Sequence, residues 1–456
     1  MLRTIALAFC LLASPVLSQT TVDVPIDQAR GIARQALLAG EFGLALRIAN
    51  GLLEVNPDDR AALLIVAAGA PGAGNPKAGR IAGARAFALA ETSNQRYEAA
   101  RLTALAASRE ERFSLATIWL RLALVFVPNE QERERTLRDG RLVRRQNPWS
   151  TNLSFSVVPS RNVNGGADEN DVDDVNGFVG NLSADALALE GIRATLNFST
   201  SYRFHETAKD RGTVVFQYQG ARVRLNDETV DDPNPANDEQ VELDSGDFSS
   251  DYAQISLRYD RALENGTMNV DLSIGAFTFG GERQYNFRRV GLSRTIPLGD
   301  PTTLFLSANR ELQIFDNENI GETLRTTLRT SLSYRLENGD RITGTVEYLE
   351  SDGDLSSQTF DRWGLEAAYS RAEPIGPVSL SATVGVRRAD YDVFFLSSDG
   401  TRQDENVFYG VNLGLPDVEY AGFTPLLNIS GSQTDSNVGR FTRSNFSVGL
   451  TLTSAF

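Results

Sequence analysis

The residues that most often carry enzyme chemistry are scarce in this chain of 456 residues. It has one histidine, His205, and one cysteine, Cys10. A serine–histidine–acid triad needs a histidine that an acid orients beside a serine, whereas we place His205 beside a turn at the end of a strand. Metal sites of the zinc type need several His or Cys ligands. We therefore predict no catalytic residue, no metal site and no cofactor, and hence no enzyme.

Other short stretches resemble ligand sites only in composition. Gly69–Gly74 (GAPGAG) lacks the Lys-Ser/Thr pair of a phosphate loop, and we interpret it as a joint between two repeats. The acidic stretches Asp168–Asp174 and Asp227–Glu242 lack the D-x-[DN]-x-[DN]-G spacing of an EF-hand. We interpret both as solvated loops, with a calcium loop as the alternative.

Charged side chains at alternating positions are a further candidate. Within Glu322–Leu336, the apolar set Leu324, Leu328, Leu332 and Tyr334 alternates with a polar set that includes Arg325, Arg329 and Arg335. Further charged residues on the same face of other segments are Arg362, Arg387, Glu311, Glu347 and Glu366. This face is either a wall of mutually neutralising ion pairs or a polarised lumen that guides a charged passenger.

These charges belong to a region of strands that begins after Trp149. From there to the C-terminus, apolar and polar residues alternate with period two, which is typical of strands with two different faces. We count fourteen such segments. They are Thr151–Pro159, Ala186–Phe204, Thr213–Leu225, Asp251–Arg261, Thr267–Phe279, Arg283–Ile296, Thr302–Phe315, Glu322–Leu336, Arg341–Ser351, Thr359–Arg371, Pro377–Tyr391, Asn406–Leu415, Gly422–Ser432 and Arg443–Phe456. Phe178–Glu190 is an alternative fifteenth strand.

The polar face distinguishes a transmembrane barrel from a β-sandwich. Segments such as Asp251–Arg261 would place Gln254, Ser256 and Arg258 in a dry core, which costs several kcal/mol for each unpaired group. In a barrel these residues face the lumen and the apolar ones face lipid. Short turns such as Glu337–Asp340 alternate with long polar loops, as in outer-membrane barrels. We predict an antiparallel barrel of about 14 strands over residues 150–456, with outer-membrane lipid around it.

The N-terminus and the overall composition indicate a bacterial envelope protein. Arg3, the apolar stretch Ile5–Leu12 and Val16-Leu17-Ser18 predict a signal peptide over residues 1–18. Cys10 lies within it, so the mature chain has no cysteine. The net charge of −15 argues against nucleic acid as a partner. We predict the outer membrane of a Gram-negative bacterium.

Residues 19–149 have helical periodicity and repeat themselves. Phe42 and Phe113, Ala45 and Ala116, and Pro57 and Pro128 lie 71 positions apart, about two repeats of the tetratricopeptide type. A degenerate copy falls at Ala78, Ala82 and Ala86. We predict a tetratricopeptide-like α-solenoid, with a generic array of helical hairpins as the alternative. An even strand count places this domain on the same side as the C-terminus, in the periplasm.

Two stretches carry a likeness to a known family. One is PSRNVNGG (Pro159–Gly166), and the other is Gly422-Phe423-Thr424-Pro425 followed by Asp435-Ser436-Asn437. With the repeats, Asn147-Pro148-Trp149 and a closing barrel, the chain resembles the surface lipoprotein assembly modulators (Slam family) over nearly all of its mature length. The resemblance implies a periplasmic helical domain and a fourteen-stranded barrel that help lipoproteins or secreted proteins across the outer membrane (type XI secretion).

We therefore predict a protein translocator. Its repeats would bind a client protein in the periplasm, and barrel-insertion machinery would read the last strand and Phe456. The alternatives are an exopolysaccharide-export porin, which predicts a lumen rich in aromatic residues or in charges of one sign, and a nutrient porin with a periplasmic scaffold.

Overall fold

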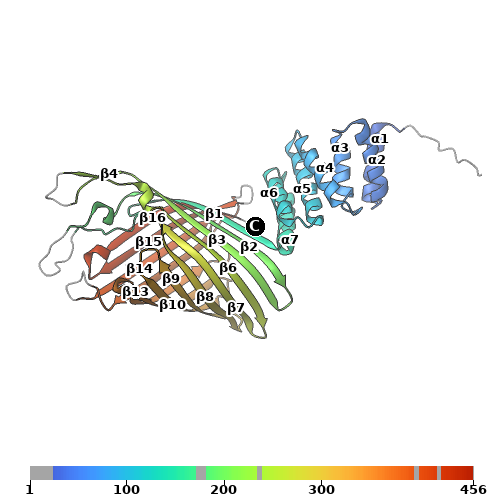
Figure 1. The fold of residues 1–456 in the computed structure, drawn as a ribbon. Coiled ribbons are helices and arrows are strands. Elements are labelled where there is room, and N and C mark those ends of the chain that lie inside the picture. Colours follow the sequence, from blue (N-terminus) through green and yellow to red (C-terminus); the bar gives the residue numbers. More distant parts are fainter. Residues whose placement is uncertain (1–23, 171–180, 234–238, 395–399, 419–422, 455–456) are drawn as a thin grey trace, which may run out of the picture. The chain divides into compact units, whose positions relative to one another are not determined.

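The computed structural model describes residues 24–170, 181–233, 239–394, 400–418 and 423–454. The chain divides into two compact units, with the boundary between Glu130 and Gln131. The first unit is helical, and the second contains a β-barrel (Figure 1). The predicted signal peptide, residues 1–18, lies outside the described residues.

Seven helices occupy the described part of the chain before the barrel. They are α1 (Ile26–Leu38), α2 (Phe42–Val55), α3 (Arg60–Gly69), α4 (Pro76–Ala88), α5 (Ser93–Arg109), α6 (Phe113–Val125) and α7 (Glu130–Gln146). The repeat read from the sequence corresponds to α2 and α6, which begin at Phe42 and Phe113 and end just before Pro57 and Pro128. Both helices end there because proline cannot donate a backbone hydrogen bond. None of the described helices is long and apolar enough to span a membrane.

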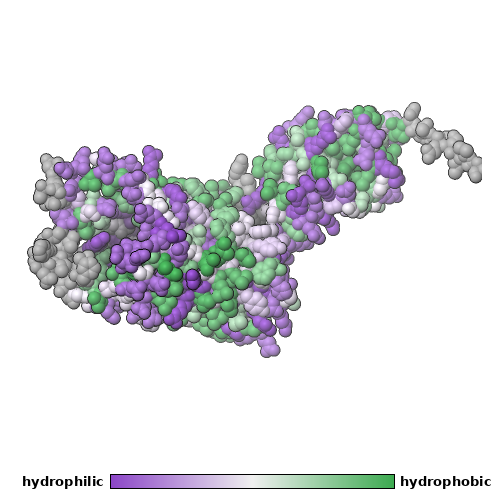
Figure 2. Space-filling model, viewed as in Figure 1, coloured by the Kyte–Doolittle hydropathy of each residue, from purple (hydrophilic) through white to green (hydrophobic). Residues whose placement is uncertain are grey.

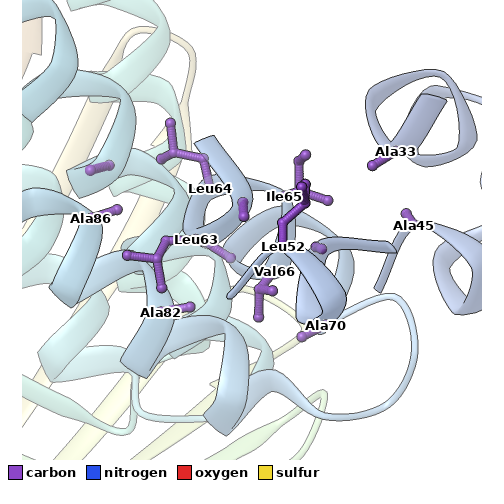
Figure 3. Packing of buried hydrophobic residues seen from close by; sticks show 14 of the residues in the cluster. Ala33, Ala45, Leu52, Leu63, Leu64, Ile65, Val66, Ala70, Ala82 and Ala86 are labelled. Atoms are coloured by element: carbon purple, nitrogen blue, oxygen red, sulfur yellow. The ribbon is translucent and has the colours of Figure 1, made fainter. Parts of the chain in front are cut away.

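Alanine dominates the core of the helical unit. Ala45 and Ala49 of α2 are fully buried, as are Ala116 and Ala123 of α6. Ala45 and Ala49 pack against α3, whose residues Ala62 to Ala67 are all buried (Figure 3), whereas Ala123 packs against Tyr97 and Ala100 of α5. Small side chains let neighbouring helices approach closely. The backbones of these helices therefore lie close together, with a few larger side chains, mainly those of α3, packed between them.

A single carboxylate joins two of these helices. Asp59 caps the N-terminus of α3 by accepting hydrogen bonds from the amides of Ala61 and Ala62. Its Oδ2 atom also accepts from Nε and Nη2 of Arg30 on α1, at 3.0 and 2.8 Å. Burial alone would raise the pKa of Asp59, but the Arg30 guanidinium and the two amides outweigh it and hold the pKa below its usual range.

We expect Asp59→Ala to lower the free energy of unfolding of the helical unit by about 2 kcal/mol, because it removes a cap and a partly buried ion pair. The neighbouring Asp58, whose side chain is 62% exposed in its pair with Arg85, is the matched control. Asp58→Ala should cost less than about 0.5 kcal/mol. Thermal melts followed by helical circular dichroism measure both.

The same pair predicts a pH dependence. Because the folded-state pKa of Asp59 is lowered, its contribution is complete above the unfolded pKa of about 4 and is lost as pH falls through the folded value. The stability gap between wild type and Asp59→Ala should therefore shrink below about pH 4. A gap that stays constant to lower pH would contradict the ion-pair origin of the effect.

Fourteen antiparallel strands close into a barrel, as predicted. They are β1 (Trp149–Ser160), β2 (Gly191–Glu206), β3 (Asp210–Leu225), β6 (Ser250–Leu263), β7 (Gly266–Phe279), β8 (Glu282–Gly299), β9 (Thr302–Phe315), β10 (Glu322–Arg335), β11 (Arg341–Gly353), β12 (Phe360–Ser370), β13 (Ser379–Tyr391), β14 (Arg402–Gly414), β15 (Phe423–Ser436) and β16 (Arg443–Ser454). Each strand pairs with its neighbours in sequence order, and β1 pairs with β16. A separate hairpin of β4 (Thr229–Asp231) and β5 (Gln240–Glu242) lies in the loop between β3 and β6.

The outer wall of the barrel is apolar. Alternate residues of the strands, such as Leu272, Ile274, Leu365 and Leu450, are half-exposed there. Figure 2 shows a hydrophobic band on the barrel and hydrophilic residues beyond it. Outward-facing aromatic residues stand near the strand ends, among them Trp149 and Tyr202, whose ring centroids are 4.8 Å apart. An apolar band with aromatic residues at its margins is the outer surface of an outer-membrane barrel.

Strand boundaries differ from the prediction by up to five residues, and the differences at the starts of β2 and β14 have a clear cause. The second strand begins at Gly191 rather than at Ala186, because Asn164 binds the carbonyls of Asp185 and Leu187 and the amide of Leu189. These backbone groups are satisfied without a strand partner. Residues 181–190 accordingly form a short 3-10 turn and isolated bridges, so the described part of Phe178–Glu190 is not a fifteenth strand. β14 begins at Arg402, four residues before its predicted start, because Arg402 still pairs with Tyr391.

The connections differ between the two rims. Residues 161–190, 226–249 and 392–401 form long connections at one rim, whereas the other rim has short turns such as the one before Gly266. Gly266 has φ of +92°, and a side chain there would collide with the carbonyl of Thr295. Because the strand number is even, Trp149 and the end of β16 lie at the same rim, the one with the short turns.

Candidate functional site

Strand register groups the lumenal residues into rows. One row runs Arg329, Glu347, Gly364, Arg387, Asn406, Thr434 and Arg443, through consecutive pairs of β10 to β16. The next row toward the long loops contains Arg362, Ala389 and Asp404. Tyr391 and Arg402 pair in the row beyond it. Residues from seven strands are thus brought onto one patch of the inner wall.

This patch borders a pocket of about 490 Å³. We call it the basic pocket. Its charged lining residues are Arg362, Arg387, Arg402, Arg443 and Asp404. Asn406, Asn445 and several Ser and Thr residues supply neutral hydrogen-bonding groups, and Phe360, Tyr391 and Phe408 supply aromatic surface. The pocket is therefore an anion-attracting hollow in the lumenal wall, built by β12 to β16.

In the described part of the chain, the lumenal charges are paired with one another over one part of the wall and not over another part. Glu347 pairs with Arg329 at 3.4 Å and with Arg362 at 3.0 Å, and Arg289 pairs with Glu311 at 3.2 Å. These pairs neutralise one another. Arg387, in contrast, lies 4.2 Å from the ring centroid of Phe408.

Arg335 and Arg325 differ from the other predicted arginines. Arg335 pairs with Asp300 at the short-turn rim, away from the basic pocket. The Nε atom of Arg325 is buried without a hydrogen-bond partner among the described residues.

The mouth of the basic pocket is a feature that the sequence did not reveal. The guanidinium carbon of Arg402 lies 4.4, 5.4 and 3.2 Å from the ring centroids of Tyr391, Phe394 and Phe441. Arg402 also donates from Nε to Asp404 at 2.9 Å. Phe394 follows β13 and Phe441 follows β15, and their rings contact the guanidinium of Arg402 and help to fix it. Contacts between loops far apart in sequence leave no periodic pattern.

The opposite wall of the lumen is filled by side chains. Tyr252 and Phe287 stack at 5.4 Å, and Arg289 lies over Phe287. Gln254 and Gln313 are buried beside them, at 7% and 1% exposure. Tyr252 and Phe287 are thus lumenal aromatic residues whose rings pack on one another rather than lining an open surface. A second hollow of about 430 Å³ lies beside β1 to β3 and has no charged side chain among its described lining residues, so the arginines gather at the basic pocket.

The junction of β1 and β16 closes the barrel. The two strands pair from Ser154–Thr453 to Val157–Leu450 and again at Ser160–Ser447. Pro159, which has no amide hydrogen to donate, lies in the interruption. The junction has fewer hydrogen-bonded pairs than its neighbours and needs other support.

The stretch Pro159–Gly166 supplies that support at the long-loop rim. Asn162 is 5% exposed and donates from Nδ2 to the carbonyls of Gly166 and Ser444, at 2.8 and 3.3 Å. Asp168 accepts from the amide of Ser444 at 2.9 Å, and Arg443 donates to the carbonyl of Gly165 at 3.0 Å. These bonds connect the loop after β1 to the start of β16. The motif that carried the family likeness is therefore a clamp across the closing junction.

We expect Asn162→Ala to destabilise the barrel by about 2 kcal/mol, because it leaves buried backbone groups without partners. A folded barrel migrates as a compact form on a gel when the sample is not boiled. Heating samples to increasing temperatures before electrophoresis gives the temperature at which this form is lost, and that temperature measures the stability. The exposed Asn319, in the loop between β9 and β10, is the control, and Asn319→Ala should leave that temperature unchanged. Equal effects of both variants would contradict the clamp.

The remaining candidates from the sequence lie apart from the basic pocket. His205 is exposed near the end of β2, at the short-turn rim. Gly69–Gly74 spans the end of α3 and the turn before α4. Of the acidic stretches, Asp168 belongs to the clamp, while residues 171–174 and 234–238 lie outside the described residues. No group of three or more metal-ligating side chains occurs within the described ranges.

Comparison with known proteins gives one family match. Residues 302–456 match the family described as "Surface lipoprotein assembly modifier" (SlipAM). This region comprises β9 to β16, all residues that line the basic pocket, and the predicted motif at Gly422–Pro425. It excludes the helical unit and the stretch Pro159–Gly166. The predicted resemblance is confirmed for this C-terminal region. No curated protein matches the chain.

Solved structures with a similar arrangement are outer-membrane porins of low sequence identity. OccAB3 of Acinetobacter baumannii is 11% identical, covers 67% of this chain and 98% of its own, and has a TM-score of 0.37. OprB of Pseudomonas putida is 10% identical, covers 71% and 96%, and has a TM-score of 0.36. TM-scores this low lend no support to any conclusion about this chain. The barrel is established by the strand pairing.

Proposed function

We propose that this outer-membrane protein moves client proteins to the cell surface through its barrel, because residues 302–456 match the surface lipoprotein assembly modifier family. The clients are surface lipoproteins or soluble secreted proteins. The observation that carries the proposal is that the family-matched region includes every residue lining the basic pocket in the lumenal wall. The protein acts as a transporter without catalytic residues, metal or cofactor.

In this proposal the helical unit lies in the periplasm and captures the client. Two arguments support this placement. Trp149, where the barrel begins, shares a rim with the end of β16, because the strand number is even. The long connections gather at the opposite rim, which in outer-membrane barrels is extracellular. Helical arrays of stacked hairpins present extended surfaces that bind proteins.

The barrel-assembly machinery is the second proposed partner, through the last strand. β16 carries outward-facing Leu450 and Leu452 and ends after them, at the short-turn rim. The terminal Phe456 lies outside the described residues. Deleting Phe456 should lower the amount of barrel in the outer membrane while the helical unit stays folded. Normal outer-membrane levels of that variant, measured by immunoblotting, would count against the partner.

Deleting the gene and comparing surface-labelled and secreted proteins with those of the parent strain tests the proposed function. We expect one or a few proteins to disappear from the surface or the medium and to accumulate in the periplasm. Restoring the full-length chain should return them. An unchanged surface and secreted protein set, together with a reduced flux of a glycan or a small solute, would instead support a porin.

A further inference from the structure

We propose that the basic pocket binds acidic side chains of an extended segment of the client during passage. This rests on the proposed function, because it takes the lumen to be the client's route. The proposal adds a chemical class of ligand and a position in the barrel. It stands on charge, on shape and on the spacing of groups along the wall.

The charge of the basic pocket is not balanced from within. Its lining contains four arginines and one carboxylate, that of Asp404. Asp404 pairs with Arg402, and Arg362 shares Glu347 with Arg329. Among the described residues, neither Arg387 nor Arg443 has a carboxylate within ion-pair distance. Arg443 donates one bond to the carbonyl of Gly165. Two guanidinium groups are therefore left for an anionic ligand.

Glycine residues leave open space in the wall around Arg387. Its neighbour in the row is Gly364, on β12. Phe408 lies over Gly385, where a Cβ atom would collide with the ring, so the ring lies flat against the wall. Arg387 stacks on this ring, with its guanidinium carbon 4.2 Å from the ring centroid. Stacking on an aromatic face leaves the edge of a guanidinium, with its N–H donors, free to bind a carboxylate.

The spacing of the polar groups fits an extended chain. Arg402, Asp404, Asn406 and Phe408 alternate along the lumenal face of β14, and inward side chains on a strand repeat about every 7 Å. An extended peptide has the same repeat for every second side chain. A segment with acidic residues at alternate positions can therefore place one carboxylate in the row that holds Arg387 and Arg443, and the next beside the arginine-bearing rows toward the long loops. Asn406 and Ser432 offer hydrogen bonds to its backbone.

An acidic peptide explains the pocket better than a glycan does. Sugar sites use exposed aromatic faces, but the ring of Phe408 is occupied by Arg387, and Tyr391 and Phe441 hold Arg402. The remaining carboxylates that face this wall, Glu347 and Glu366, lie on β11 and β12. They border the cluster of arginines on one side, so attraction for an anion is greatest on the side of β13 to β16.

Binding of a fluorescent peptide of alternating Glu and Ser to the purified full-length protein in detergent, followed by anisotropy, tests the inference. We expect the Glu peptide to bind and the same peptide with Gln for Glu to bind much less. Raising the salt concentration should weaken binding, because salt screens charge attraction. Arg387→Gln should weaken it about tenfold, the effect of losing one charge-assisted contact.

The next residue in the chain provides the matched control. Arg388 faces the outer wall and pairs with Asp390 and Glu405, so Arg388→Gln should leave binding unchanged. Arg387→Lys keeps the charge and should retain most of the affinity. Loss of the compact electrophoretic form identifies a misfolded variant. In that case the salt dependence and the Gln peptide on the wild-type protein decide the question.

Three results would overturn the inference. They are equal affinity of wild type and Arg387→Gln, equal binding of the Glu and Gln peptides, and stronger competition by an acidic polysaccharide than by the Glu peptide. Gene deletion separates this inference from the proposed function. If deletion removes surface proteins but the peptide does not bind, the pocket assignment alone fails. If the peptide binds but deletion changes no surface or secreted protein, the proposed function fails.

Discussion

Replacing Leu450 with arginine should remove most of the folded barrel from the outer membrane. Leu450 lies on β16, is 52% exposed on the outer wall and has the apolar neighbours Val157 and Leu427 in its row. An arginine on the lipid face near the bilayer middle costs about 2–4 kcal/mol. Because β16 also makes the sparsely paired closing junction with β1, this cost falls on the strand that completes the barrel. The fraction with compact mobility on unboiled gels measures the effect.

The adjacent Thr451 provides the control on the same strand. Its side chain faces the lumen, where Oγ1 donates to Asn428 at 2.7 Å. Thr451→Arg loses this hydrogen bond, worth about 1 kcal/mol, but places the charge in a polar interior. We expect most of that variant to fold. Equal loss of both variants would mean that the outer face of β16 does not contact lipid.

Removing residues 24–130 while keeping the N-terminal segment should abolish delivery of clients and leave the barrel intact. The two units each have their own interior: alanines and α3 fill the helical one, and side chains such as Phe287 and Gln313 fill one side of the barrel. The barrel should therefore fold without the helical unit. In the proposed function, the client is then no longer captured.

Two measurements distinguish this outcome from general damage. Compact mobility and outer-membrane levels of the truncated protein should equal those of the full chain. Surface labelling should show the same missing proteins as the gene deletion. Normal surface delivery by the truncated protein would show that the helical unit is dispensable, and capture would then have to take place at the barrel itself.

The sequence was sufficient for the architecture. Period-two alternation is a property of single strands, so each segment could be recognised by itself, and fourteen of them predicted a closed barrel before any pairing was known. The spacing between Phe42 and Phe113 likewise identified α2 and α6 as equivalent helices. The predicted strand boundary was wrong where a side chain, and not a neighbouring strand, makes the backbone hydrogen bonds. Asn164 does so for the residues before Gly191.

What only the tertiary structure decided is which lumenal charges neutralise one another. The sequence placed Arg329, Arg362 and Arg387 on one face, but their partners depend on the register between strands. Register joins residues that are far apart in the chain and leaves no trace in local periodicity. The structure assigns Glu347 to Arg329 and Arg362 and leaves Arg387 on the ring of Phe408. The structure also shows what Pro159–Gly166 does: this stretch, which the sequence offered only as a family likeness, clamps the closing junction. Its partners come from β16, nearly 300 residues later in the chain.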